Sequence, residues 1–457
     1  MKLKLFILIT LIPFFATAQY SKLMDFGTIE TGAYPYFAEF IYADGYLYGT
    51  TTNWGLYNDG TIFKIKTDGS DFVKLLDFQD TITGAVGQSG LVSDGTYLYG
   101  ITKYQAAYGF GGIYKIKMDG SDFVKIYDFP GEEGGSFPEG KLFYDGEYLF
   151  GMSPSGGAFS KGFIYRLKTD GSDFTNIFSF DGPTSGTGPY GALISDGTFL
   201  YGMTTYGGLL NQGTAFKVKK DGTSYQKLMD MQDDPNGSLP YGSLVYDGTY
   251  LYGMTNIGGE YNYGTIFKIL TDGTGYEKLY DFDLTTGAQP LGSLIIDGTT
   301  IYGMTELGGP DNDGFAFQID NDGSNFTHLI DFDGDNGSLP FGSLIKVNGA
   351  LFGMTNYGGA NNTGVIFRYG EEIIEAVNDI TKNNITISPN PNSGNFNITV
   401  DAADLQNDLK LEVINPLGQT ILSQTITSTQ TQIHLSQKIP GLYLIKCGSE
   451  ISTVLVF

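Results

Sequence analysis

A pattern of about 50 residues, repeated seven times, constrains the fold of this chain more than any other feature. The tripeptide Leu-Tyr-Gly, or a close variant, recurs at spacings of 50 or 51 residues and ends at Gly49, Gly100, Gly151, Gly202, Gly253, Gly303 and Gly353. A second marker of the type "TIFKI" follows each copy, at 61–65, 112–116, 163–167, 214–218, 265–269, 315–319 and 365–369. Such a period predicts a repeat architecture in which each unit buries its apolar face against its neighbours.

Each repeat contains four short segments with the composition of β-strands. Segments 243–255 and 266–282 each hold two runs rich in Tyr, Phe, Ile, Leu and Val, around Asp247-Gly248 and Asp272-Gly273. An Asp-Gly pair between apolar runs favours a tight hairpin turn, since glycine accepts positive φ. Four antiparallel strands in each unit are typical of a β-propeller. A linear solenoid is the main alternative.

The two ends of the repeat region distinguish these architectures. A third marker of the type "KLLDF" closes the first six units, but the seventh stops after "VIFRY" at 365–369. The missing copy, "KLMDF", stands at 22–26, near the N-terminus. In a ring these two segments are neighbours, whereas a solenoid would leave two exposed strand edges. We therefore predict an all-β fold, a seven-bladed β-propeller over residues 19–370 that is closed by the N-terminal strand.

The first residues have the features of a secretory signal peptide. Lys2 and Lys4 precede an apolar run, 5–15, and the small-x-small site Ala16-Thr17-Ala18 follows it. This pattern predicts a signal peptide over residues 1–18. No later stretch approaches the roughly 20 apolar residues that a membrane helix needs, so we expect a soluble mature protein.

The composition limits the possible partners. A formal net charge of −24 argues against nucleic acid and anionic membranes, because both reward clustered Lys and Arg. The acidity serves solubility, or else it forms an acidic recognition surface. The single cysteine, Cys447, excludes an internal disulfide framework, so stability must come from a buried core. We expect a monomer without a cofactor.

The repeat pattern ends after Gly370. Residues 371–384 are rich in Glu and Asn and are predicted to be a linker. In residues 385–457, apolar residues alternate between Pro, Asn and Gly turns, which predicts a small β-sandwich.

This C-terminal segment closely resembles the type A sorting domain of cargo for the type IX secretion system. The residues that match the motif are Pro389, Asn390, Pro391, Gly394, Phe396, Gly418, Pro440, Gly441 and Tyr443. The resemblance implies passage through the periplasm, export across the outer membrane by the type IX machinery, and removal of the tail with release or surface attachment. An unrelated adhesive sandwich is the alternative.

The repeats, with "LYGMTxxGGxxNxGTIFKI" and "DGSxFxKLxDFDG", also resemble the GloVer tandem-repeat family of exported proteins. That resemblance covers residues 20–370. It implies the fold and carries no established activity.

The sequence offers few residues for catalysis. Of the two histidines, His434 lies in the tail, and His328 begins an outer strand where other units have Lys, so we interpret it as a surface variant. A His-ligated metal site is disfavoured for the same reason. Six units carry an aspartate at one repeat position, which favours a structural turn or backbone contact: Asp25, Asp77, Asp128, Asp230, Asp281 and Asp331. A calcium site at Asp333, Asp335 and Asn336 only partly matches an EF-hand loop, which ends in a Glu.

Aromatic residues in the longer loops are the candidates for ligand binding. They follow the second strand of a unit or precede the first, and they are Trp54, Tyr104, Tyr206, Tyr357, Tyr190 and Tyr241. Aromatic faces near Asn and Asp can stack on sugar rings and bond their hydroxyls. The alternative is that these rings pack between blades.

We therefore predict an exported or cell-surface binding module without enzymatic activity, whose ligand is a glycan or a protein. A polysaccharide-active lyase or hydrolase is the first alternative, since fold does not separate binding from catalysis. Catalysis predicts carboxylates, Lys, Arg or Tyr gathered in one sector, and binding predicts aromatic and amide groups over several units. A structural surface component would have neither.

Overall fold

The computed structural model describes residues 19–87, 89–104 and 107–370 and, nearer the C-terminus, 386–388, 394–400, 409–415, 420–435, 441–447 and 450–456. The predicted signal peptide 1–18 and the predicted linker 371–384 lie outside the described residues. The chain divides between residues 373 and 374 into two compact units.

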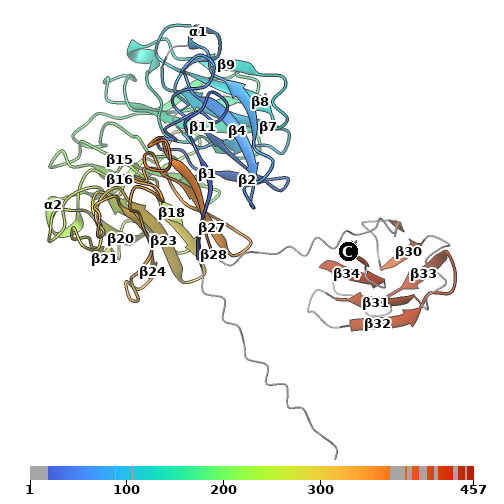
Figure 1. Ribbon diagram of the computed structural model, residues 1–457. Helices are drawn as coiled ribbons and strands as arrows, with labels where there is room; N and C mark the ends of the chain where they lie inside the picture. The colour runs from blue at the N-terminus through green and yellow to red at the C-terminus, as the bar shows by residue number, and fades with distance from the viewer. Residues whose placement is uncertain are drawn as a thin grey trace, which may run out of the picture. The chain divides into compact units, whose positions relative to one another are not determined.

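The first compact unit contains seven four-stranded antiparallel sheets, one for each repeat (Figure 1). We number the repeats 1 to 7 in chain order. Repeats 1 to 4 contain β2 (Ile41–Ala43), β3 (Tyr46–Thr50), β4 (Thr61–Lys66), β5 (Val73–Asp77); β6 (Val92–Ser93), β7 (Tyr97–Thr102), β8 (Gly112–Lys117), β9 (Val124–Asp128); β10 (Phe143–Tyr144), β11 (Tyr148–Ser153), β12 (Phe163–Lys168), β13 (Thr175–Ser179); and β14 (Ile194–Ser195), β15 (Phe199–Thr204), β16 (Thr214–Lys219), β17 (Gln226–Asp230).

Repeats 5 to 7 continue the pattern. Their strands are β18 (Val245–Tyr246), β19 (Tyr250–Thr255), β20 (Thr265–Leu270), β21 (Glu277–Asp281); β22 (Ile295–Asp297), β23 (Thr300–Thr305), β24 (Phe315–Asp320), β25 (Thr327–Asp331); and β26 (Ile345–Val347), β27 (Ala350–Met354), β28 (Val365–Gly370) with β1 (Gln19–Asp25). Three short helical turns, α1 (Asp80–Thr83), Glu132–Gly134 and α2 (Asp233–Asn236), lie in loops between sheets.

The N-terminal strand β1 completes the sheet of repeat 7. It pairs antiparallel with β28, from Gln19 opposite Gly370 to Asp25 opposite Val365, and Figure 1 shows it beside β28. Asp25 adds a bond across this seam, since its Oδ1 accepts from the backbone N–H of Ala360 at 2.8 Å. The pairing predicted for the two ends of the repeat region is therefore present.

The apolar core lies between the sheets. Each of seven clusters of buried residues joins one repeat to the next; between repeats 1 and 2, for example, Ile62 and Phe78 pack with Leu91 and Leu98. The remaining clusters have the same plan. One of the seven joins repeat 7 to repeat 1 and includes Phe26, Phe40, Phe63, Phe352 and Ile366.

In repeats 3 to 7, the first strand is shorter than the sequence pattern predicts, because the glycine before it packs backbone to backbone with the next repeat. A Cβ added to Gly242 would lie 2.2 Å from the carbonyl oxygen of Gly292, and one added to Gly292 would lie 2.0 Å from that of Gly342. These segments therefore contact neighbouring repeats instead of extending the ladder of their own sheet.

The second compact unit has two sheets around one core. One contains β29 (Thr386–Ser388), β30 (Asn395–Thr399) and β33 (Gln430–His434), and the other β31 (Lys410–Ile414), β32 (Thr420–Thr425), β34 (Gly441–Cys447) and β35 (Glu450–Val456). Buried Phe396, Tyr443 and Cys447 belong to the shared core. Of the predicted sorting motif, Pro389, Asn390, Pro391, Gly418 and Pro440 lie outside the described residues.

Candidate functional site

All seven repeats contribute to one cavity, which we call the mouth. It has a volume of about 50 Å³ and is lined by Phe37, Glu39, Ser89, Gly90, Glu139, Gly140, Lys141, Tyr190, Gly191, Ala192, Tyr241, Gly242, Ser243, Leu291, Gly292, Ser293, Phe341, Gly342 and Ser343. These residues precede the first strand of each repeat. Because successive strands run antiparallel, they lie on the side of the longer loops, opposite the Asp-Gly turns.

A strained backbone position directs these segments toward the mouth. The residue directly after the bridge residue that precedes the first strand has a left-handed backbone in every repeat: Val86, after Ala85, has φ 62°, and Leu239, after Ser238, has φ 54°. Such a φ is costly for non-glycine residues, most of all for β-branched ones, and persists only where the surroundings impose it. Here the N–H of Leu239 donates to the Gln212 carbonyl of the preceding repeat at 2.9 Å, and the N–H of Tyr34 donates to Thr363 of repeat 7 at 3.0 Å.

Three of the predicted ligand-binding tyrosines meet at one side of the mouth. Tyr206 and Tyr241 share a hydrogen bond between their hydroxyl oxygens at 3.1 Å. The ring of Tyr190 lies with its centroid 5.7 Å from that of Tyr241 and 6.5 Å from that of Tyr206. All three side chains are half-buried. Repeats 4 and 5 thus offer ring faces and phenol groups together.

The phenols of Tyr190 and Tyr241 are neutral at ordinary pH, because the pKa of each is raised. Burial is the main cause that raises the pKa of Tyr190 and of Tyr241, and the charge of Glu139 raises both further. Burial and the charges of Glu139 and Glu306 likewise raise the pKa of Tyr36 in repeat 1. A neutral phenol can both donate and accept hydrogen bonds, so the tyrosines suit hydroxyl-bearing ligands and not proton abstraction.

Two ion pairs lie in repeats 1 to 3, and three of their four residues, Glu39, Glu139 and Lys141, line the mouth. Lys103 contacts Glu139 with an N–O distance of 2.6 Å, and Lys141 pairs with Glu39 across Gly90. Gly90 leaves room for the second pair, since an added Cβ would lie 2.3 Å from the Glu39 side chain. Burial lowers the pKa of Lys141 to about 8, whereas the carboxylate beside it favours the charged form.

The Lys141–Glu39 pair separates the mouth from a second cavity of about 250 Å³. Glu39, Lys141 and Ser243 line both cavities, and the second is otherwise walled by first-strand residues such as Ile194 and Ile295. Backbone N–H groups along this wall donate to serine hydroxyls of the next repeat, for example from Ser243 to Ser293 at 2.9 Å. The Lys141–Glu39 ion pair therefore forms part of the wall of both cavities.

The other predicted aromatic residues lie apart from the tyrosine group. Tyr104 is 41% exposed and packs against Phe137, and Tyr357 is 36% exposed and packs against Tyr34. Trp54 is 38% exposed and has φ 63°, at a position where repeats 3 to 7 have glycine. These three rings are placed on the loop side, each in contact with solvent.

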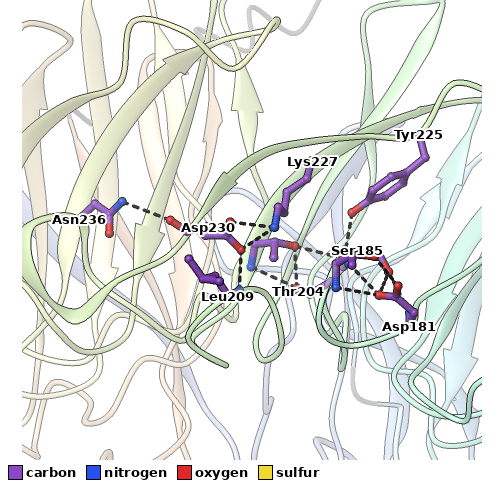
Figure 2. Close-up of polar contacts among 10 residues, drawn as sticks. Asp181, Ser185, Thr204, Leu209, Tyr225, Lys227, Asp230 and Asn236 are labelled. Carbon is purple, nitrogen blue, oxygen red and sulfur yellow. Dashed lines mark hydrogen bonds and ion pairs between the residues drawn. The ribbon is translucent and has the colours of Figure 1, made fainter.

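The recurring aspartates have the structural role that their repetition predicted. Figure 2 shows Asp230, whose Oδ1 accepts from the backbone N–H of Leu209 at 2.8 Å and from the Lys227 ammonium at 2.9 Å. In the same view the Tyr225 hydroxyl donates to the Ser185 carbonyl, and Asp181 holds the turn of Ser185. The loop after the second strand is thereby tied to the outer strand.

Repeat 6 departs from this arrangement. Pro310 stands where other repeats supply the N–H group, and His328 replaces the lysine, so Asp331 accepts a bond from His328 at 2.9 Å and is 44% exposed. The His328 ring stacks on Phe315 at 4.1 Å. A pocket of about 480 Å³ beside it is lined by six residues, among them Leu284, Pro310 and His328.

Two side chains of the predicted calcium site, those of Asp333 and Asn336, bond to the loop itself. Asn336 N–H donates to Asp333 Oδ1 at 2.9 Å, Asp333 N–H donates to Asn336 Oδ1 at 3.0 Å, and the carbonyl of Asp335 accepts from Lys22 at 3.4 Å. Among the residues that the structure describes, no group of three or more His, Cys, Asp and Glu side chains is arranged to hold a metal ion.

Sequence reasoning missed the charged residues in and beside the mouth. Glu39 and Lys141 share one repeat position, where the other units have glycine, alanine or serine, and Glu306 stands at the repeat position of Lys103. Glu139 stands where the other units have aromatic, Gln or Leu residues. Aligning the seven repeats column by column could have found them, because most other units carry no charge at these positions. Their pairing depends on contacts between repeats, which the pattern within one repeat does not report.

The repeat region matches the Gloeobacter/Verrucomicrobia repeat over residues 13–194, 132–270 and 246–386. Residues 386–455 match the secretion system C-terminal sorting domain. No curated protein matches the chain.

Several solved structures resemble the chain. An oligogalacturonate lyase in complex with manganese has a TM-score of 0.52 at 13% identity, covering 77% of this chain and 93% of its own. The extracellular domain of a putative hybrid two-component system from B. thetaiotaomicron has a TM-score of 0.52 at 13% identity, and the match covers 84% of this chain and 44% of that domain's chain. PorZ, a surface component of the type IX secretion system of Porphyromonas gingivalis, has a TM-score of 0.46 at 14% identity, and the match covers 93% of this chain and 59% of the PorZ chain. The first two likenesses show the fold alone, which is propeller-like.

The tail determines where the protein goes. A sorting domain of this type directs export by the type IX system across the outer membrane, to the cell surface or the medium. In the described part of the chain, no helix has the length and apolar character needed to cross a bilayer. The chain belongs to the Gloeobacter/Verrucomicrobia repeat family and carries a C-terminal sorting domain of the type IX secretion system.

Proposed function

We propose that the seven sheets are the blades of a closed propeller and that the mouth binds a glycan outside the cell. The seam between repeats 7 and 1 supports closure, because it has the same inter-repeat hydrogen bond and the same kind of apolar cluster as the other six. Closure removes strand edges that would otherwise aggregate.

The group of Tyr190, Tyr206 and Tyr241 is the observation that carries the glycan proposal. Half-buried rings beside a cavity give an apolar face for a sugar ring, and their hydroxyls give donors and acceptors for its hydroxyls. Sugars combine these two surfaces within one residue. Lys141 in the mouth and Lys103 next to it are held in ion pairs, which leaves them less available to act on a substrate.

A polysaccharide hydrolase is the second candidate, and one observation favours it. Glu306 is a carboxyl group whose pKa is raised by burial, while Glu139 is held by Lys103. Two carboxyl groups in such different environments can divide the roles of acid and base. Their separation is the quantity on which this candidate depends.

A glycan array probed with the chain from residue 19 onward tests the proposal. We expect saturable binding without new reducing or unsaturated ends in the reaction products. Tyr190→Ala and Tyr241→Ala should each weaken binding about fivefold or more, since one ring contact contributes about 1 kcal/mol. Tyr108→Ala is the matched control, because Tyr108 is 61% exposed and lies outside the mouth.

New reducing or unsaturated ends on the glycan would show that the protein is a catalyst and not only a binding module. Equal binding by the wild type and both tyrosine variants, with each variant folded as judged by thermal unfolding, would contradict the assignment of the mouth.

A further inference from the structure

Glu306 differs from the other charged residues near the mouth. Lys103 and Lys141 have Glu139 and Glu39 as partners, whereas Glu306 has no ionic or hydrogen-bonded partner among the described residues. Its side chain is half-buried, and its charge acts on Tyr36 at the mouth. With Glu306 ionised, this region therefore has two cations and three anions.

The equivalent residues of other repeats indicate what Glu306 lacks. Thr205 donates its hydroxyl to the carbonyl of Pro240 in the next repeat at 2.7 Å, and the Asn256 amide donates to that of Pro290 at 3.5 Å. An ionised carboxylate has no proton to donate. Between repeats 6 and 7, the hydrogen-bond acceptor Glu306 therefore takes the position at which Thr205 and Asn256 are donors.

A second unused acceptor lies one repeat further on. Asn356, at the same repeat position, is 2% exposed, and its side-chain oxygen has no hydrogen-bond partner. Leaving a buried acceptor unpaired costs free energy, so a donor brought by a ligand would be stabilising. A Cβ added to Gly364 would lie 3.3 Å from the Asn356 carbonyl oxygen and 3.1 Å from Pro35, and one added to Gly314 would lie 2.6 Å from the Glu306 carbonyl oxygen and 2.8 Å from Pro340. Asn356 and Glu306 therefore lie next to the segments that carry Tyr36 and Phe341.

Three aromatic rings lie on the segments that precede the first strands of repeats 1 and 7. The ring centroid of Tyr36 lies 4.6 Å from that of Phe37 and 4.9 Å from that of Phe341, with interplanar angles of 84° and 81°. Rings set at right angles present both edges and faces to the space beside them. Aromatic faces attract cations, and a nearby carboxylate strengthens that attraction.

We propose that this side of the mouth binds the ammonium group of an amino sugar, with Glu306 as its ion-pair partner and Tyr36, Phe37 and Phe341 as its aromatic wall. The inference rests on the proposed glycan binding and names the class of sugar. An ammonium group supplies three N–H donors for the acceptors Glu306 and Asn356. The formal net charge of −24 attracts such a ligand and repels uronic-acid polymers.

Titration calorimetry with two probes tests the inference. The chain from residue 19 onward is titrated with a glucosamine hexamer and with an N-acetylglucosamine hexamer at about pH 6.5, where amines are charged. We expect the glucosamine hexamer to bind at least tenfold more tightly. Glu306→Gln should remove that preference, and Glu277→Gln should retain it, because Glu277 lies on the outer strand β21 and carries the same charge.

The stability of the variant controls for misfolding. Burial raises the pKa of Glu306 above its ordinary 4.5, so stability contributed by the protonated form is lost as the pH rises through that raised value. Glu306→Gln should therefore keep or raise the melting temperature at neutral pH while losing the preference for the amine.

The outcomes separate this inference from the proposed function. Equal affinity for the two hexamers, or an unchanged preference in Glu306→Gln, would overturn the ammonium site while leaving glycan binding standing. Failure to bind any glycan would remove both. Binding of a lysine-rich peptide in place of the amino-sugar oligomer would also overturn the inference, in favour of a protein ligand.

Discussion

Asp230 illustrates how a single side chain ties two parts of a repeat together. Its carboxylate accepts from Leu209 in the preceding loop and from Lys227 on its own strand. Five repeats use an aspartate in this way, and repeat 3 uses Ser179, which accepts from Ala158 at 3.2 Å. Repetition in the sequence was enough to predict a structural role, because a catalytic pair needs only one or two units.

Replacing Asp230 by alanine should destabilise the protein by about 1.5–3 kcal/mol, the usual value of hydrogen bonds to a charged group. Asp331→Ala is the matched control and should cost less than about 1 kcal/mol, because Pro310 offers no N–H and Asp331 is 44% exposed. Chemical denaturation of both variants measures the difference. Equal losses would mean that the loop bond is not the source of stability.

At the scale of strands, the sequence predicted the segments and turns well. Period-two patterns and Asp-Gly pairs are local, so the hairpins β18–β19 and β20–β21 follow from residues near in the chain. The short first strands could not be predicted in this way. Their length depends on the glycine before them, whose contact is with the next repeat.

The charged side of the mouth was unpredictable for the same reason. Lys141 and Glu39 are 102 positions apart and pair only because Gly90 lies between their repeats. By contrast, the aromatic residues Tyr190 and Tyr241 were identified from their repeat position alone. Composition thus revealed the aromatic part of the site, and only the three-dimensional arrangement revealed its ion pairs and Glu306.

Gly242→Ala tests the backbone contact between repeats. The added Cβ would lie 2.2 Å from the Gly292 carbonyl, so the segments must separate, at a cost of about 1–3 kcal/mol. Gly248→Ala is the comparison, since an added Cβ there meets open space and the cost should come only from its φ of 99°, about 1 kcal/mol. A drop in thermal stability no larger for Gly242→Ala than for Gly248→Ala would contradict the close contact.

At the scale of the whole molecule, the account depends on the N-terminal strand. Strand β1 supplies the outer strand of repeat 7, and Phe26 beyond it enters the cluster shared by repeats 7 and 1. A mouth lined by all seven repeats requires the first and last repeats to be neighbours. The proposed binding site therefore depends on the closed, cyclic order of the repeats.

Amide hydrogen exchange in the intact mature chain tests that claim most directly. If β1 closes the ring, peptides covering Gln19–Asp25 should be protected to the same degree as those covering β28 and the equivalent outer strand β5. Exchange of β1 at the rate of an unstructured segment, while β28 and β5 stay protected, would contradict closure and with it the proposed mouth.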